Sequence, residues 1–305
     1  MTPRALVLSL CLAACAHAQP TRVEVAVTAP VETSLAEPSL RDTQAVWLAM
    51  IAGARRSLDV EQFYVSEQAG EALTPVLDAL RAAASRGVRV RMVVDRRFHE
   101  TYPDAVRALD ALPGIEARVV DYGPRGGVQH AKFFVVDGAR AFLGSANFDW
   151  RALRHIHEVG VAIDDPAVAR GLAAVFARDW GDAAPEDPSG DRVGAPEPSP
   201  TGAGDARITV LASPPSTTPA GVGDSLTAVL AMLDGARRSV DVQVYEYALR
   251  GHGPDQTPWT ALDDALRRAG ARGAGAAAGR RDGAATRGRR AARAGAGAEA
   301  SRCAR

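Results

Sequence analysis

Hydrophobic and polar positions follow two recurring periods along residues 40–184. Apolar residues at helical spacing predict helices over residues 45–54, 71–85, 104–112 and 166–180. Short runs rich in valine predict strands over residues 58–65, 88–94, 115–120, 129–137 and 141–144. Helices that alternate with short strands indicate an α/β domain, in which a sheet is flanked by helices.

A change of composition divides the chain into two predicted domains. Residues 185–206 are dominated by Gly, Pro, Asp, Ala and Ser, which is typical of a linker. The linker separates a first domain at residues 40–184 from a second at residues 207–273. The stretch Gly53–Val60 recurs with a single replacement as Gly235–Val242. This internal repeat predicts that the second domain is a copy of the first.

The copy is interrupted after Gly273. Residues 274–305 contain no Leu, Ile, Val, Phe, Tyr or Trp, so this low-complexity basic tail cannot build a core. A shifted reading frame would turn its Gly and Ala codons into the Val and Arg of the missing strand, and a frameshift product is our hypothesis. The alternative is a genuine basic tail that serves as an interaction segment.

The first residues have the pattern of an export signal. The apolar run Ala5–Ala14 is too short to span a bilayer, and residues 1–18 are predicted to be a signal peptide. Leu12-Ala13-Ala14-Cys15 is typical of a bacterial lipoprotein and predicts lipidation at Cys15, whereas Ala16-His17-Ala18 would suit ordinary signal peptidase. Residues 19–39 are expected to be a tether. The protein is therefore predicted to be exported and anchored in the bacterial cell envelope, facing the periplasm or the exterior.

The charge balance gives no global sign of a polyanionic partner. Lys and Arg total 36, as do Asp and Glu, so the formal net charge is zero. The tail is basic, and residues 1–273 are correspondingly acidic. Lys132 is the only lysine, which indicates a position that needs a compact point charge. The three cysteines offer no disulfide framework.

Candidate chemistry lies on the predicted strand 129–137. His130 and Lys132 are two residues apart, so both project from one face of the strand. A neutral imidazole can attack phosphorus while a neighbouring ammonium neutralises the phosphate oxygens. After the next strand, Ser145 and Asn147 offer a hydroxyl and an amide beside the small residue Gly144. These residues point to chemistry on a phosphate ester.

Together, His130-x-Lys132-x-x-x-x-Asp137 and Gly144-Ser145-x-Asn147 resemble the signature of the phospholipase D superfamily. The resemblance covers about residues 42–273. The run Gly144–Arg151 is most similar to a branch with lysosomal membrane-anchored and poxvirus members. It implies a phospholipase D-like sandwich, in which a mixed β-sheet is flanked by helices, with one complete half and an incomplete second copy. It also implies that no metal or other cofactor is needed.

The resemblance implies a role for each site residue. His130 would be the nucleophile or the proton donor, and Lys132 and Asn147 would hold phosphate oxygens. Ser145 would line the pocket. Glu158 would accept a hydrogen bond from the second ring nitrogen of His130, and Asp137 would belong to the catalytic motif in a role more structural than chemical.

The family mechanism forms a phosphohistidine and uses a histidine from a second copy to protonate the leaving oxygen. The counterpart of His130 is expected beyond Arg305, so this chain supplies half of such a site. A homodimer would supply the other half, but the interrupted copy occupies the partner's place, and a homodimer is not favoured.

We expect a phosphodiesterase that hydrolyses phospholipids or transfers phosphatidyl groups at a membrane surface, because the acidic body and the predicted anchor favour lipid. Two alternatives stay open. One is a nuclease that acts on single-stranded nucleic acid by the same chemistry, and the other is a truncated, catalytically inactive chain.

Other conspicuous side chains are expected to be structural. His155 and His157 are expected on the surface or in packing rather than at a metal, and His99 is expected in a loop. Core packing is predicted for aromatic residues on the repeated strands, with base stacking as the minor alternative, namely Phe63, Tyr64, Tyr245 and Tyr247.

Overall fold

The computed structural model describes residues 21–123, 127–185, 208–244, 247–249 and 258–278. The predicted signal peptide with Cys15, nearly all of the linker, and the tail from residue 279 lie outside the described residues. The chain divides into a first unit, residues 1–228, and a second unit, residues 229–305.

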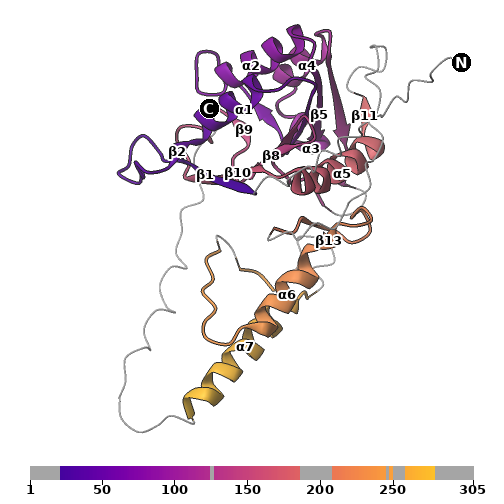
Figure 1. Ribbon diagram of the computed structural model, residues 1–305. Coiled ribbons are helices and arrows are strands. Elements are labelled where there is room, and N and C mark those ends of the chain that lie inside the picture. Colours follow the sequence, from indigo (N-terminus) through magenta and orange to yellow (C-terminus); the bar gives the residue numbers. More distant parts are fainter. Residues whose placement is uncertain (1–20, 124–126, 186–207, 245–246, 250–257, 279–305) are drawn as a thin grey trace, which may run out of the picture. The chain divides into compact units, whose positions relative to one another are not determined.

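A mixed sheet forms the centre of the first unit, as the sequence predicts (Figure 1). Its strands lie in the order β11-β6-β5-β3-β7-β8-β10-β1-β2. Strands β3, β5 and β6 pair in parallel, and β7, β8, β10 and β1 pair antiparallel. The bounds are β1 Arg22–Thr28, β2 Arg41–Asp42, β3 Ser57–Gln62, β5 Arg89–Asp95, β6 Ile115–Val120, β7 Phe133–Val136, β8 Arg140–Gly144, β10 Glu158–Asp164 and β11 Ala184–Pro185.

Helices cover both faces of this sheet. On one face lie α1 (Thr43–Ala52), α2 (Thr74–Ser85) and α4 (Asp104–Asp110), and on the other lies α5 (Pro166–Asp182) (Figure 1). The short helix α3 (Arg96–His99) follows β5 directly. The side chain of Asp42 caps α1, and that of Asp165 caps α5 by accepting hydrogen bonds from two backbone N–H groups. The predicted helices and strands of residues 45–180 are therefore confirmed, with shifts of a few residues at most of their ends. The strand predicted over residues 129–137 is shorter, so His130 and Lys132 precede β7, and β10 was not predicted.

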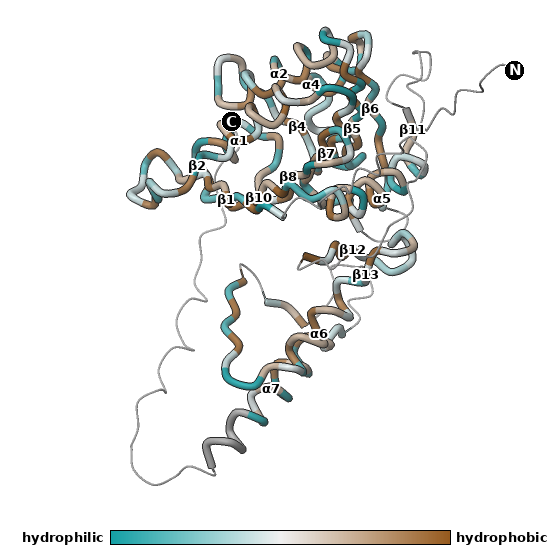
Figure 2. The backbone as a smooth tube through the Cα atoms, in the orientation of Figure 1, coloured by the Kyte–Doolittle hydropathy of each residue, from teal (hydrophilic) through white to brown (hydrophobic). Residues whose placement is uncertain are grey.

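Alternation along β7 gives each face of the sheet its own hydrophobic core. Phe134 and Val136 point toward α1 and α2, whereas Phe133 and Val135 point toward α5. Figure 2 shows the hydrophobic residues on the central strands β5 and β7. Two short parallel pairs lie outside the main sheet: β4 (Val65–Ser66) with β9 (Phe148–Asp149), and β12 (Leu211–Ala212) with β13 (Gly223–Asp224).

The expectation that residues 19–39 form a tether is wrong for residues 22–28. These residues form β1, which pairs along its whole length with β10. Ala26 and Thr28 are buried, and the valines at positions 23, 25 and 27 alternate with them. The period-two pattern is short and flanked by Pro and Thr residues, but pairing with β10 is enough to hold it in the sheet.

The second domain was expected to begin at residue 207, but residues 208–228 belong to the first unit. Val210 packs on α5 at Gly171, where an added Cβ would lie 2.9 Å from Val210 Cγ2. Thr217 interacts with Tyr122 at the end of β6. These contacts attach the segment from Ile208 to Thr217 to the first domain rather than to the copy.

The second unit contains the end of α6 (Ser225–Gly235) and α7 (Ala261–Ala278), joined by ion pairs from Asp234 to Arg268 and Arg272. The copied segment that follows α6 forms no strand within the described residues 236–244, where Val242 and Val244 are exposed. Tyr247 is 49% exposed, so core packing is wrong for Tyr247, and Tyr245 lies outside the described residues. Helix α7 continues five residues past Gly273, where the copy was expected to fail, because alanine has a high helix propensity.

Candidate active site

His130 and Lys132 lie in the extended segment that leads into β7. The imidazole of His130 contacts the edge of the Phe63 ring, with ring centroids 4.5 Å apart. The ammonium of Lys132 lies 5.2 Å from the centroid of the same ring. Lys132 is only 6% exposed, and its Nζ donates a hydrogen bond to the backbone oxygen of His130 at 2.7 Å. Phe63 therefore packs beneath both residues, and the backbone holds them side by side as the sequence predicts.

Burial lowers the pKa values of both His130 and Lys132. Partial burial, with help from the charge of Lys132, lowers the pKa of His130, so the imidazole is neutral near pH 7 and has a free nucleophilic nitrogen. Burial also lowers the pKa of Lys132 to about 8, against the opposing charge of Glu158. An anionic phosphate would supply the counter-charge that favours the ammonium form.

The ends of β8 and β10 bring Ser145 and Glu158 to the same place. The backbone N–H of Gly144 donates to the Lys132 carbonyl oxygen at 3.1 Å. This hydrogen bond connects the turn that follows β8 to the segment that carries His130 and Lys132. The Ser145 hydroxyl donates to the Glu158 carboxylate, and the N–H of Val159 donates to Ser145 Oγ at 3.0 Å. The structure therefore gathers Lys132, Ser145 and Glu158 around one point.

Asn147 has an unused acceptor at this site. Its Oδ1 is buried and has no hydrogen-bond partner in the described part of the chain. A buried amide oxygen without a donor is costly, so a ligand or water is expected to supply one. A phosphate oxygen is itself an acceptor, so only the Nδ2 donor of the amide could serve the phosphate-holding role that the resemblance implies for Asn147.

Glu158 differs from its implied role. The described residues show no hydrogen bond between Glu158 and His130; the carboxylate bonds Ser145 and acts on Lys132 through its charge. The reason is the register of β10, since Gly160 pairs with Gly144 and so brings Glu158 next to Ser145. In this structure the carboxylate thus contacts Ser145 and acts on Lys132, rather than holding the ring of His130.

Asp137 lies at the far end of β7 from Lys132. Its carboxylate accepts hydrogen bonds from the backbone N–H groups of Arg55, Arg56 and Ser57. Partial burial raises its pKa, but these three donors outweigh burial and hold the pKa below its usual range. Its φ of 56° is left-handed, as tight turns require. The contacts give Asp137 a structural role in joining β7 to the start of β3.

The glycine of the Gly-Ser-x-Asn turn is explained by close packing. A Cβ at Gly144 would lie 2.8 Å from the Cα of Gly160, and a Cβ at Gly160 would lie 2.3 Å from Cζ of Phe142. The two glycines face one another across β8 and β10. Both are needed for these strands to approach with the Phe142 ring beside them.

An aromatic group beside His130 was missed by the sequence analysis, which placed Phe63 and Tyr64 in the core. Phe63 contacts Phe98, with ring centroids 4.1 Å apart, and Tyr64 contacts both Phe98 and Tyr102. Tyr64, Phe98 and Tyr102 are half-buried. The Tyr64 hydroxyl donates to Asp149 at 2.9 Å, which anchors the group to the turn that carries Asn147. Tyr64 lies between β3 and β4, whereas the sequence pattern placed it inside a single strand over residues 58–65.

His155 and His157 have the structural surroundings that were expected, and His99 does not. His155 pairs with Glu32 through its Nδ1, and His157 is exposed. His99 is buried at the end of α3 rather than in a loop. Among the described residues, no group of His, Cys, Asp and Glu side chains could hold a metal ion. Nor is any described helix long and apolar enough to cross a bilayer.

The mixed sheet, with its His-x-Lys pair beside a Gly-Ser-x-Asn turn, defines a phospholipase D-like domain. Residues 47–180 match the family described as "Cardiolipin synthase, PLD-like domain". The chain belongs to the phospholipase D superfamily.

Comparison with known proteins gives relatives with different activities in their names. The chain is 34% identical over 261 residues to the 5'-3' exonuclease PLD3 of Bos taurus, covering 77% of this chain and 52% of that protein. It is 26% identical over 270 residues to phospholipase D Z of Dictyostelium discoideum, covering 81% and 63%. It is 33% identical over 140 residues to the virion nicking-joining enzyme of vaccinia virus, covering 44% and 32%. The chain thus spans about half the length of the first of these relatives.

Among solved structures, the chain is similar to a phospholipase D family member, Nuc from Salmonella typhimurium. The similarity covers 54% of this chain and 98% of that one, with 25% sequence identity and a TM-score of 0.44.

Proposed function

We propose that this protein is a phosphodiesterase that acts on single-stranded nucleic acid, with His130 as the attacking group. The observation that carries the proposal is the half-buried aromatic group, Tyr64, Phe98 and Tyr102, beside the His130–Lys132 pair. Bases of a single strand stack on aromatic side chains, and this stacking contributes about 1–3 kcal/mol per base. The aromatic rings would bind a base while the adjacent phosphate lies at Lys132.

The geometry suits attack through a histidine. A neutral ring nitrogen of His130 forms a bond to phosphorus as the bond to the leaving oxygen breaks. The Lys132 ammonium and the Asn147 amide would hold the phosphate oxygens, where negative charge builds up. Water then attacks the phosphohistidine, which breaks the nitrogen–phosphorus bond and restores the free imidazole. The leaving oxygen needs a proton, and in the superfamily mechanism a second histidine supplies it.

The names of two relatives also support a nucleic-acid substrate. The exonuclease and the nicking-joining enzyme are each named for action on nucleic acid, and each is at least 33% identical to this chain over the matched residues. The preference for phospholipid that followed from the charge balance stays a prediction. So does the anchoring of the protein at a membrane surface.

A phospholipid is the second candidate because apolar side chains flank Ser145 and Glu158. Leu143 is 40% exposed and Val159 is 49% exposed, and each is the immediate neighbour of a residue of the site turn or of Glu158. Exposed aliphatic side chains at this position could contact acyl chains. The relative named phospholipase D Z is consistent with this candidate.

One experiment separates the two candidates. The purified chain would be incubated with a fluorescently labelled single-stranded oligonucleotide and, separately, with vesicles containing a fluorescent phosphatidylcholine. We expect release of labelled nucleotides, and we expect His130→Ala to abolish it while His157→Ala, which alters an exposed histidine outside the site, does not. Turnover of the lipid alone would overturn the nucleic-acid proposal. Equal background in all three proteins would show that the chain is inactive.

A further inference from the structure

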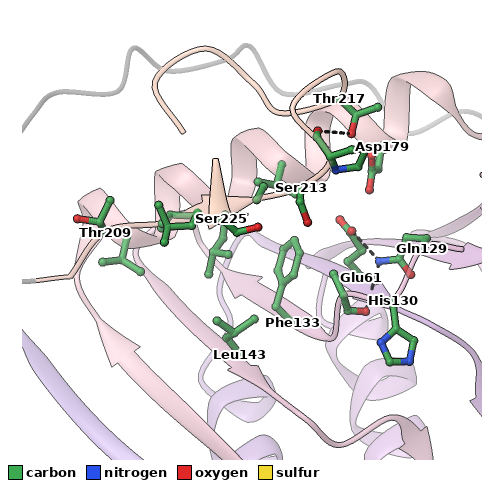
Figure 3. Close-up of a pocket in the computed structure, with 18 of the residues that line it drawn as sticks. Glu61, Gln129, His130, Phe133, Leu143, Asp179, Thr209, Ser213, Thr217 and Ser225 are labelled. Atoms are coloured by element: carbon green, nitrogen blue, oxygen red, sulfur yellow. Dashed lines mark hydrogen bonds between the residues drawn. The ribbon is translucent and has the colours of Figure 1, made fainter. Parts of the chain in front are cut away.

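We propose a second ligand site in the first unit, a cavity that binds an apolar molecule carrying a cationic, hydrogen-bond-donating nitrogen at one end. The cavity has a volume of 720 Å³, which lies in the range of small-molecule sites. It lies between the α5 face of the sheet and the segment from Ile208 to Ser213 (Figure 3). The proposal does not depend on the phosphodiesterase activity.

The cavity borders the catalytic pair, because His130 is one of its lining residues whereas Lys132 is not. Phe133 lines the cavity and belongs to the core on the α5 side, whereas Phe134 belongs to the other core. Gln129 and Ala131, in the segment that precedes β7, also line the cavity. Figure 3 shows the ring of His130 directed away from the ring of Phe133. A molecule in the cavity would therefore lie next to His130 without contacting Lys132.

Most of the cavity wall is aliphatic. The sheet contributes Leu143 and Ile163, helix α5 contributes Leu172 and Val175, and the crossing segment contributes Val210. A preformed apolar cavity with few polar groups favours a ligand with an extended hydrocarbon part. Burial of that part from water would supply most of the binding free energy.

Carboxyl groups form the polar end of the cavity. Glu61 on β3 and Asp179 on α5 both line it, and Figure 3 shows the Glu61 carboxyl directed toward Asp179. Glu61 is completely buried. Glu61 Oε1 accepts a hydrogen bond from Gln129 Nε2 at 2.7 Å, and Asp179 Oδ1 accepts one from the Tyr122 hydroxyl at 2.7 Å. No sequence pattern marks this pair, because the two residues are far apart along the chain.

The polar end has one acceptor without a donor and one carboxyl pair. Gln129 Oε1 has no hydrogen-bond partner within the described residues, and Glu61 is hydrogen-bonded to the facing carboxyl of Asp179. Burial, followed by repulsion from Asp179, raises the pKa of Glu61, and burial also raises the pKa of Asp179, so the pair tends to hold a proton. A protonated nitrogen would take the place of that proton, donate to these oxygens and favour the ionised carboxyls. An anionic head would add to the repulsion and is excluded on the same ground.

The test compares three small molecules with one hydrocarbon chain and different heads: octylamine, octanol and octanoate. Each would be used to displace the neutral fluorescent probe N-phenylnaphthylamine from the full chain. We expect octylamine to bind at least about tenfold more tightly than octanol, since a hydrogen bond to a charged group is stronger, and octanoate not to compete. Equal binding of all three would overturn the proposal, because it would show apolar adsorption without recognition of the head.

Two variants link binding to the cavity. Glu61→Gln should remove the preference for octylamine over octanol, while Glu37→Gln, which alters an exposed carboxylate, should leave it unchanged. Val175→Phe should fill the cavity and weaken all probes, which provides a second test if Glu61→Gln does not fold. If octylamine still binds Val175→Phe with unchanged affinity, the site is elsewhere.

A third variant separates this site from the active site. Lys132→Ala should abolish phosphodiester turnover but leave octylamine binding within about twofold, because Lys132 does not line the cavity. Loss of octylamine binding in a folded Lys132→Ala protein would place the amine at the catalytic face and overturn the proposal. Absence of turnover in every protein, with octylamine binding retained, would contradict the proposed function and leave the cavity site intact.

Discussion

The side-chain ammonium of Lys132 donates a hydrogen bond to the backbone carbonyl oxygen of His130, with the two atoms 2.7 Å apart. An ammonium has three N–H donors, so two remain for phosphate oxygens beside the imidazole. The catalytic pair is thus held together by the backbone, without a direct bond between the two side chains. The relative position of nucleophile and cation depends on the length and flexibility of a lysine stem.

Lys132→Arg should therefore be a poor replacement. The planar guanidinium cannot fold back to the His130 carbonyl in the same way, and it directs its donors in a fixed fork. We expect kcat to fall by about a hundredfold or more on the substrate that is turned over, with a smaller change in KM. Steady-state kinetics of Lys132→Arg and Lys132→Ala would test this, and an arginine variant with wild-type kcat would contradict it.

The pH dependence of kcat/KM should be bell-shaped. His130 must be neutral to attack, so activity rises as pH increases through its pKa, which burial places below the usual 6.5. Lys132 must be charged, so activity falls as pH increases through its pKa of about 8. In Lys132→Arg the residual activity should lose the alkaline decline, because a guanidinium stays protonated. A decline that persists unchanged in this variant would assign it to another group.

Asp137→Ala should reduce stability and spare the chemistry. The substitution removes the acceptor for three backbone N–H groups and leaves a residue with a Cβ at a left-handed φ. We expect the free energy of unfolding to fall by about 1–3 kcal/mol in denaturant titrations. At a temperature where the variant is folded, kcat should stay within about twofold of wild type. A large loss of kcat in the folded variant would instead give Asp137 a part in catalysis.

Gly160→Ala should disturb the turn that carries Ser145. The new methyl group would lie 2.3 Å from Phe142 Cζ, so the ring or β10 must move. We expect a loss of about 1–3 kcal/mol in stability and weaker substrate binding. Gly181→Ala, near the end of α5 with open space around the glycine, is the matched control and should be neutral or slightly stabilising. Equal effects of both substitutions would contradict the packing argument.

Local patterns predicted most elements of residues 45–180, because each of these follows from hydrophobic period and turn residues, but they did not predict β10. Local patterns failed where the presence of a neighbouring strand decides whether a segment forms a strand. The valines at positions 23, 25 and 27 form a strand only because β10 offers a free edge, and the copied valines at 240, 242 and 244 have no such edge among the described residues. His130 and Lys132 were found from spacing alone, whereas the contacts of Glu158 and the Glu61–Asp179 pair depend on register and tertiary packing.

Strand β1 also limits the distance between the domain and a lipid anchor at Cys15. If Cys15 carries a lipid, only the residues from 16 to 21 separate it from Arg22, the first residue of β1. Even fully extended, this stretch spans about 20–25 Å. The β1 side of the sheet would then lie against the bilayer headgroups, and a soluble polymer would have to reach His130 from the side of the domain that faces away from the lipid.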